Sequence, residues 1–253
     1  MDPKAMGPYG AALRSYFAGD TGAALFLHRD DGQEAQLPVS HFFRPPSTFT
    51  PIEELALAHC SGPVLDVGAG TGLHSLVLQH KGFQVTAIDI STEAVEIMAH
   101  RGVQDVHCAD LFEYQGGPFG TVLMMGHGIG MVETLAGLDR FLAHARGWLS
   151  GEGQVLLDSL DVRVTDDPGN LAYQEANRRA GRSIGEVRMH LEYQGQRGAP
   201  CGWLHVDSET LRQQAAKAGW DCEVILTEAG GDYLARLTKG RTALLGTAEE
   251  EGC

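Results

Sequence analysis

From Val64 onward, short apolar runs alternate with segments in which apolar residues recur every three or four positions. The short runs predict buried strands, and the three-to-four spacing predicts helices. Regular alternation of the two is typical of βαβ units, which build a parallel sheet with helices on its faces. We therefore expect a doubly wound α/β fold in this part of the chain.

The expected elements follow one another closely. Strands are predicted, in chain order, at Val64–Val67, Phe83–Asp89, Asp105–Cys108, Thr121–Met125 and Gln154–Asp158. Helices are predicted from Leu73 to a stop at Gly82, from a cap at Ser91 or Thr92 to Gly102, and along the apolar stripe from Leu138 to Leu149. The segment SGEG at 150–153 predicts a turn before the fifth strand.

The regular alternation of strands and helices ends on both sides of this core. Downstream we expect paired strands at Glu186–Tyr193 and Cys201–Val206, a helix capped by Ser208 that runs to Ala218, and an antiparallel pair formed by Glu223–Thr227 and Tyr233–Thr238. Upstream, Asp31-Gly32 predicts a hairpin of segments 24–27 and 35–39, and a helix is expected from Pro51 to His59.

These changes suggest domain boundaries. Residues 1–62 are expected to form an N-terminal segment and possible lid, and residues 63–239 the main domain. An insertion at about 162–205 is expected on the substrate side, and residues 240–253 are expected to be a frayed tail.

The charge and composition of the chain limit the kinds of partner that it can bind. The 253 residues carry 19 Lys and Arg against 33 Asp and Glu, a net charge of −14, and such a surface repels a nucleic-acid backbone. We see neither a signal segment nor an apolar stretch able to span a bilayer, so we expect a cytoplasmic protein without a membrane partner. The five cysteines form no CxxC pair and are expected to be mostly buried thiols.

The segment VLDVGAGTG, from Val64 to Gly72, carries the clearest chemical signal. A buried strand leads directly into Gly68, Gly70 and Gly72 at the head of a helix. Glycines allow a sharp turn and let a ligand approach the amides, and a helix N-terminus offers free N–H groups. Taken alone, such a loop is a weak indication.

Three acidic residues strengthen the indication of a ligand-binding site. Asp66 lies inside the strand, where a buried charge needs a donor-rich partner. Asp89 ends the next strand, where a carboxylate can accept both hydroxyls of a ribose. Asp110 follows the third strand in CADLF, placed to accept from an adenine amino group beside Leu111 and Phe112. Each acid could singly be a buried hydrogen-bonded or capping residue, but together they describe a nucleoside-shaped pocket.

With these motifs the chain resembles the class I S-adenosylmethionine-dependent methyltransferases over about residues 64–158. The matching motifs are VLDVGAGTG, VTAIDIS, CADLF and TVLMMGHGIG. The resemblance implies S-adenosylmethionine as cofactor and a Rossmann-like seven-stranded sheet, mostly parallel with an antiparallel C-terminal strand. It implies that the backbone of the glycines lies along the methionine part of the cofactor and that Asp66 holds the amino end of that part. It also implies that Asp89 holds the ribose and that Asp110 holds the adenine. The implied cofactor-binding residues are Asp66, Gly68, Ala69, Gly70, Gly72, Asp89, Ile90, Ala109, Asp110, Leu111, Met125 and Gly126.

Two alternatives remain open at this point. A nicotinamide-dependent dehydrogenase would also use a loop like GAGTGL, although Leu73 stands where that fingerprint needs its third glycine and Asp66 has no obvious use beside a pyrophosphate. A catalytically silent protein that binds S-adenosylmethionine as a sensor or partner subunit would share every cofactor motif.

Methyl transfer from a sulfonium needs the nucleophile held in line with the methyl group, and a base only if the acceptor must lose a proton. His127, in GHGIG directly after the fourth strand, is the candidate general base, with a hydrogen-bonded loop histidine as the alternative. His74 is interpreted as a helix-surface residue. Met125-Gly126 stands where a magnesium-binding acid would end the fourth strand, so metal-independent transfer is expected. The acceptor is expected to be an O, N or C atom of a small molecule.

Recognition of this acceptor is expected outside the cofactor half. Arg178, Arg179 or Arg182 is a candidate to bind an anionic acceptor such as a carboxylate, because arginine suits bidentate recognition. A solvated helix face is the alternative. Phe43 and Arg44, just before Pro45-Pro46, are candidate substrate-binding and lid residues, with core packing as the alternative for at least one phenylalanine.

Overall fold

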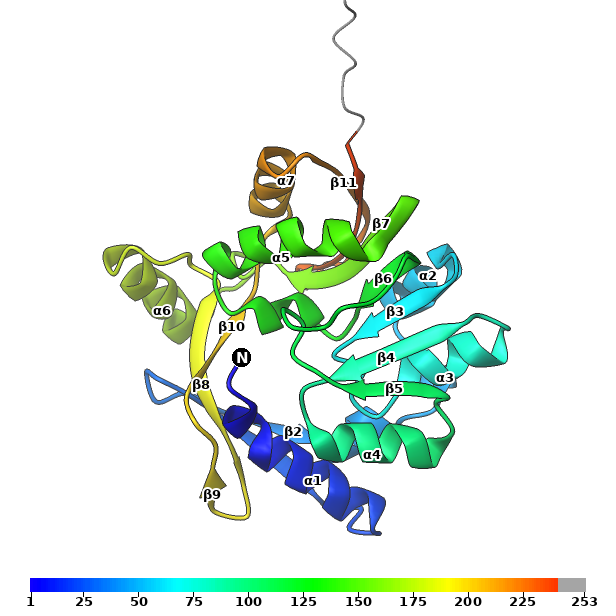
Figure 1. The fold of residues 1–253 in the computed structure, drawn as a ribbon. Coiled ribbons are helices and arrows are strands. Elements are labelled where there is room, and N and C mark those ends of the chain that lie inside the picture. Colours follow the sequence, from blue (N-terminus) through cyan, green and yellow to red (C-terminus); the bar gives the residue numbers. More distant parts are fainter. Residues whose placement is uncertain (241–253) are drawn as a thin grey trace, which may run out of the picture.

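The computed structural model describes residues 1–240 and contains two sheets (Figure 1). The larger sheet has the strand order β11-β12-β7-β6-β3-β4-β5. Its strands are β3 (Val64–Val67), β4 (Val85–Asp89), β5 (Asp105–Cys108), β6 (Phe119–Met124), β7 (Leu149–Leu160), β11 (Trp220–Thr227) and β12 (Asp232–Lys239). The pairs from β7 to β5 are parallel, whereas β12 is antiparallel to both neighbours. This confirms the expected doubly wound sheet.

Helices cover both faces of this sheet: α2 (Pro51–His59), α3 (Leu73–His80), α4 (Thr92–Arg101), α5 (Leu135–Trp148) and α7 (Ser208–Lys217). Side chains of the central strands alternate between two cores. Val122 and Val155 pack with α5 and α7, while Leu123 and Leu156 pack with α2 and α3. Because both faces are buried, these strands appear in the sequence as continuous apolar runs.

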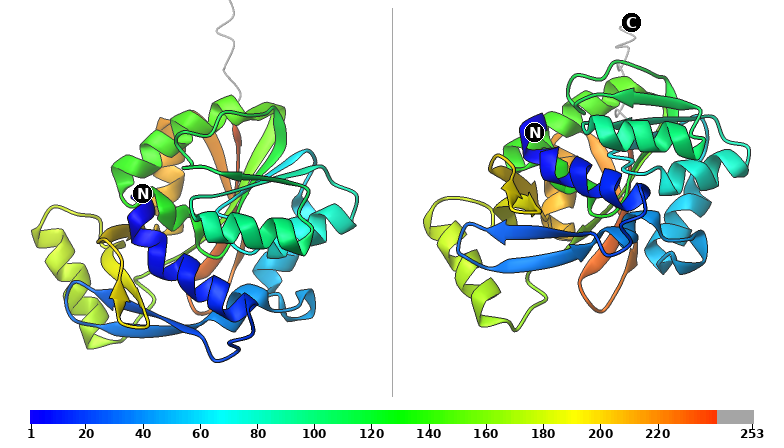
Figure 2. Two further views of the ribbon diagram at one scale, coloured as in Figure 1. Left: turned by 60° about the horizontal axis from the view of Figure 1, so that its bottom comes forward. Right: turned by 90° about the horizontal axis from the view of Figure 1, so that it is seen from below.

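The smaller sheet joins segments that lie far apart in the sequence. Its antiparallel strands are β1 (Ala24–Arg29), β2 (Glu34–Pro38), β8 (Glu186–Tyr193), β9 (Gln196–Arg197) and β10 (Cys201–Leu204). The predicted N-terminal hairpin pairs with the predicted insertion, because β1 lies beside β8. Strands from the N-terminal segment and from the insertion thus form one accessory layer beside the main sheet, whereas α2 of the N-terminal segment packs on the main sheet itself (Figure 2).

The remaining helical elements lie between or beside the sheets. Helix α1 (Gly7–Phe17), which the sequence pattern did not predict, contacts α4, β1 and β8. The other helical segments are η1 (Pro3–Met6), η2 (Val39–Phe43), η3 (Pro46–Thr48), η4 (Gly128–Val132) and α6 (Pro168–Arg179). Figure 1 shows α6 on the outer side of the smaller sheet.

Two local predictions are wrong. Asp207, not Ser208, caps α7, because the Asp207 carboxylate accepts hydrogen bonds from the amides of Glu209 and Thr210. The segment 150–153 is not a turn but part of β7, which starts at Leu149. A Cβ on Gly153 would lie 2.8 Å from the Phe119 carbonyl oxygen, so this glycine permits close strand approach.

The cysteines differ in exposure. In the described part of the chain, Cys201 is buried, Cys60 and Cys222 are half-buried, Cys108 is exposed, and all four are free thiols. Cys253 and the rest of the predicted tail from residue 241 lie outside the described residues. Within residues 1–240, no helix has the length and apolar character needed to cross a membrane.

Candidate active site

The polar residues singled out from the sequence gather at the carboxyl edge of the larger sheet. Asp66 lies in β3, just before the glycine loop, and Asp89 ends β4. Asp110 follows β5, and His127 follows β6. Ligands of open α/β sheets bind outside this edge, so the fold brings the predicted residues to one place.

The glycine loop is shaped so that only glycine fits. Gly68, Gly70 and Gly72 have φ angles of 69°, 60° and 78°, in the left-handed region. A Cβ on Gly70 would lie 3.0 Å from the Tyr9 hydroxyl, and one on Gly68 would lie 2.5 Å from Met131 Cε. The loop therefore presents backbone without side chains at these positions, and the side chains of Tyr9 from α1 and Met131 from η4 lie next to that backbone.

Asp89 is tied to this loop. Its Oδ2 accepts a hydrogen bond from the Gly70 amide at 2.9 Å, and its Oδ1 accepts one from the Ser91 amide at 2.8 Å. Burial raises the pKa of Asp89 to about 6, although the two amides favour its charged form. The carboxylate is thus fixed in orientation at the end of β4, and its ribose role stays a prediction.

Asp66 and Asp110 are also held by donors. Asp66 is 1% exposed, accepts a bond from Ser75 Oγ at 2.6 Å, and has a pKa raised by burial. Asp110 accepts from the Phe112 amide at 2.7 Å and from the Met1 amino group at 3.1 Å. The second contact is an ion pair with the positively charged N-terminus.

The other predicted cofactor residues lie around these carboxylates. Ala69, Leu111 and Met125 are buried, Ile90 and Ala109 are half-buried, and Gly126 is exposed. Leu111 is thus a buried apolar side chain directly after Asp110, and its place beside an adenine stays a prediction.

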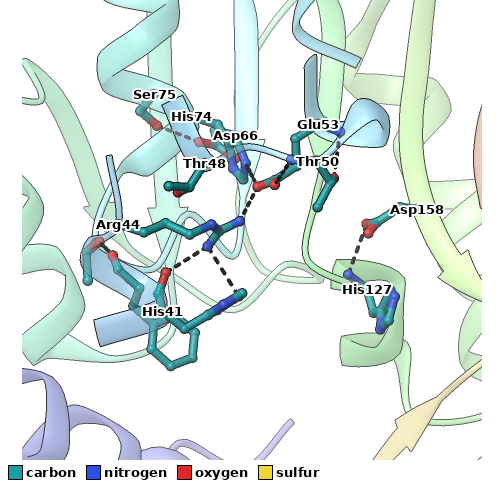
Figure 3. A network of polar contacts seen from close by, with 12 residues as sticks. His41, Arg44, Thr48, Thr50, Glu53, Asp66, His74, Ser75, His127 and Asp158 are labelled. Carbon is teal, nitrogen blue, oxygen red and sulfur yellow. Dashed lines mark hydrogen bonds and ion pairs between the residues drawn. The ribbon is translucent and has the colours of Figure 1, made fainter. Parts of the chain in front are cut away.

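A polar network that sequence reasoning missed lies nearby (Figure 3). Its centre is Glu53, which is 5% exposed and binds Arg44 Nη2 and, at 2.8 Å, His74 Nε2. Arg44 Nη1 also donates to the His41 carbonyl oxygen at 2.7 Å. Burial alone would raise the pKa of Glu53, but the bonds from His74, the Thr50 amide and Arg44 lower it to about 2. His74 is therefore not the surface residue that we expected.

His127 is held on two sides. Its backbone lies in the left-handed region with φ at 56°, and its amide donates to Asp158 Oδ1 at 2.9 Å. Its ring Nε2 lies 2.7 Å from Asp232 Oδ1 on β12. The His127 ring is thus engaged with Asp232, and a role as general base stays a prediction.

The residues predicted to bind the substrate lie in two different parts of the structure. Arg178 and Arg179 form ion pairs with Glu175 on the exposed side of α6, and Arg182 donates to Asn177 at 2.9 Å. The structure does not bring them to the cofactor edge; α6 has the solvated face that was the alternative.

Phe43 and Arg44, in contrast, lie near the edge. The Phe43 ring stacks on Tyr16 at 4.6 Å, so this phenylalanine packs in the core between α1 and η2. Thr71, in the glycine loop, donates to the Phe42 carbonyl oxygen. The η2 segment therefore contacts the loop directly.

Comparison with known proteins decides the family. A methyltransferase-domain family matches residues 41–224. A crystallised S-adenosylmethionine-dependent methyltransferase from Bacteroides fragilis, in complex with S-adenosylhomocysteine, is 33% identical, with a TM-score of 0.82 over 94% of this chain and 96% of that one. The chain belongs to the S-adenosylmethionine-dependent methyltransferases. The dehydrogenase alternative is thereby excluded, and the cofactor of this methyltransferase is S-adenosylmethionine.

More distant structures share the fold alone. The CcbJ methyltransferase from Streptomyces caelestis is 14% identical, with a TM-score of 0.58 over 79% of this chain and 92% of that one. DhpI, in complex with S-adenosylhomocysteine, is 19% identical, with a TM-score of 0.58 over 94% and 96%. No curated protein matches the chain.

Proposed function

We propose that this methyltransferase moves a methyl group to a small-molecule acceptor held over β6 and β7. The order of the strands carries the proposal. The three acids expected to hold the cofactor lie at or near the ends of β3, β4 and β5, which are neighbours in the sheet, and Met125 and Gly126 follow β6 beside them. The other half of the same edge presents His127 after β6 and Asp158 on β7. An acceptor in line with the methyl group would occupy that second half.

The expected cofactor contacts can be assigned to individual residues. The methionine part would run along the backbone of the loop at Gly68, Gly70 and Gly72, and Asp66, in the strand just before the loop, would bind its amino end. Asp89 would accept from the ribose hydroxyls and Asp110 from the adenine amino group. The walls would come from Ala69, Ile90, Ala109, Leu111, Met125 and Gly126.

The bound cofactor supplies an electrophilic methyl group on a sulfonium, which leaves as a neutral thioether. The residues of the chain position the cofactor and shield it from solvent. The Gly70 amide and Asp89 fix the loop, and Met131 and Tyr9 lie over it. We further propose that the accessory layer and the η2 segment, with Arg44, close over the acceptor and exclude water.

A small acceptor agrees with the charge of the protein. The net charge of −14 opposes binding of nucleic acid. The accessory sheet also approaches the edge where the acceptor would lie: a Cβ on Gly130 of η4 would lie 2.1 Å from Trp203 of β10. Such a covered edge suits a small molecule that can be enclosed.

Two measurements test the proposal. Calorimetry should show binding of S-adenosylmethionine and S-adenosylhomocysteine and none of a nicotinamide dinucleotide. Incubation with methyl-labelled S-adenosylmethionine and a broad metabolite panel should then give a labelled small molecule and S-adenosylhomocysteine. Cofactor binding without turnover on any small molecule would favour the silent sensor instead.

A further inference from the structure

One buried carboxylate at the edge is used by none of the roles above. Asp158 is 7% exposed and lies on β7. Met124, the last residue of β6, pairs with Leu157, so Asp158 is the first residue of β7 beyond the end of β6. This places its carboxylate at the half of the edge where the acceptor is proposed to lie.

The Asp158 carboxylate is fixed at one oxygen only. Its Oδ1 accepts from the His127 amide at 2.9 Å, and this is the only hydrogen bond to the side chain within residues 1–240. Figure 3 shows the carboxylate facing the side on which Glu53 and His74 lie, while the His127 ring turns away from them. Oδ2 is not among the fully buried side-chain atoms of residues 1–240 that lack a partner, so it keeps contact with solvent and is free to accept a hydrogen bond from a ligand.

The surrounding charges favour a cation over an anion. Arg44 is paired with Glu53, and His74 is bound to the same carboxylate. Asp66 adds a further acid on β3, which β6 separates from β7. The charges at this end of the sheet leave Asp158 without a cationic side chain bound to it, which disfavours an acceptor carboxylate and suits an ammonium group.

We infer that Asp158 is a catalytic residue that binds an amine acceptor and takes a proton from its nitrogen. The inference rests on the proposed function. Oδ2 accepts one proton from the acceptor ammonium, which frees the electron pair on nitrogen. That pair forms the new N–C bond as the C–S bond breaks, and sulfur keeps the electrons of the broken bond. The product is a methylated ammonium ion, and Asp158 returns its proton to solvent.

The assignment gives Asp158 the role that the sequence suggested for His127. The groups that act on the Asp158 carboxyl are His127 and His74, and burial outweighs them to raise its pKa to about 6. At pH 7.5 the group is ionised and ready to accept a proton. His127 acts through its backbone amide, which orients Asp158.

The experiment uses sinefungin, a cofactor analogue that carries a primary ammonium group where S-adenosylmethionine carries its methyl group. Calorimetry at pH 7.5 compares the affinities of sinefungin and S-adenosylhomocysteine for the full chain. The wild-type chain should prefer sinefungin, and Asp158→Asn should reduce this preference by about tenfold or more. Asparagine keeps an oxygen for the His127 amide, so S-adenosylhomocysteine should bind as before.

Two controls make the result specific. Asp221→Asn is the same change at an exposed aspartate of β11 and should leave the preference unchanged. His127→Asn should also keep it, because asparagine tolerates the left-handed backbone and retains the amide that binds Asp158.

The outcomes separate the two proposals. An unchanged preference in Asp158→Asn, or a preference lost in His127→Asn instead, would overturn the inference. Faster methylation of a carboxylic acid or an alcohol than of the amine with the same carbon skeleton would also overturn it. Failure of the wild-type chain to bind S-adenosylhomocysteine would instead count against the proposed function.

Discussion

The Gly70 amide donates to Asp89 Oδ2 at 2.9 Å, across a separation of 19 residues. This bond joins the glycine loop after β3 to the end of β4. It sets the position of the loop and of the carboxylate together. The part of the site expected to take the methionine and the part expected to take the ribose are therefore mechanically connected.

Replacing Asp89 by asparagine should weaken cofactor binding. Asparagine fills the same space but loses the charge that attracts two hydroxyl donors, so we expect a loss of about 2 kcal/mol in the binding free energy of S-adenosylhomocysteine. Calorimetry measures this directly. Asp105→Asn, at the opposite end of β5, is the matched control and should bind normally.

Cofactor affinity should also depend on pH through Asp89. Burial raises the pKa of Asp89 to about 6, and the charged carboxylate is the form that accepts from ribose hydroxyls. Affinity should therefore be constant above pH 7 and fall as the pH drops through 6. This decrease should disappear in Asp89→Asn and persist in Asp158→Asn. Persistence in Asp89→Asn would show that another group controls it.

Gly70→Ala should abolish cofactor binding, whereas Gly82→Ala, the matched control, should leave it intact. Gly70 and Gly82 both have positive φ angles, 60° and 90°, so each alanine variant should lose about 1–2 kcal/mol of folding stability. A Cβ at Gly82 meets nothing within 4 Å, whereas at Gly70 it would lie 3.0 Å from the Tyr9 hydroxyl, on the loop along which the cofactor is proposed to bind. Comparable cofactor affinity in the two variants would contradict the proposed position of the methionine part.

Glu53 should be important for stability. Replacing it by glutamine leaves Arg44 and His74 half-buried without their carboxylate, and we expect a loss of about 3 kcal/mol in unfolding free energy by denaturant titration. The lowered pKa of Glu53 stabilises the fold above its unfolded value of 4.5, so the difference should shrink as the pH falls toward 2. Glu223→Gln, at a 60% exposed side chain paired with Arg236, should cost less than about 1 kcal/mol.

The η2 segment should become protected when the cofactor binds. Phe42 accepts a bond from Thr71 in the glycine loop, so ordering of the loop should also order residues 39–44. Limited proteolysis with chymotrypsin, with and without S-adenosylhomocysteine, measures this protection at Phe42 and Phe43. Identical cleavage in both conditions would reject the lid.

The cofactor half could be predicted because its signals are local. In the stretch from Val64 to Asp110, strand ends, glycines and acids follow one another closely, and parallel strands deliver their ends to one edge. The order of elements in the chain was therefore enough to bring Asp66, Asp89 and Asp110 together. The cap at Ser91 and the stop at Gly102 were predictable for the same reason.

The polar contacts of Glu53 and of His127, on the side where we propose the acceptor, could not be predicted because they are not local. Glu53 looks like a capping-box residue three positions after Thr50, and it does make that box. Its bonds to Arg44 and His74 depend on the packing of η2 and α3 against α2, which no short pattern encodes. Likewise, Asp232 meets His127 across 105 residues only because β12 is inserted beside β7.

A crystal structure of the chain with S-adenosylhomocysteine tests the central claim most directly. The account predicts the ribose hydroxyls within hydrogen-bond distance of Asp89, the adenine amino group at Asp110, and the sulfur facing the half of the edge that holds Asp158. Density for the ligand at another surface, or with the ribose away from Asp89, would contradict it.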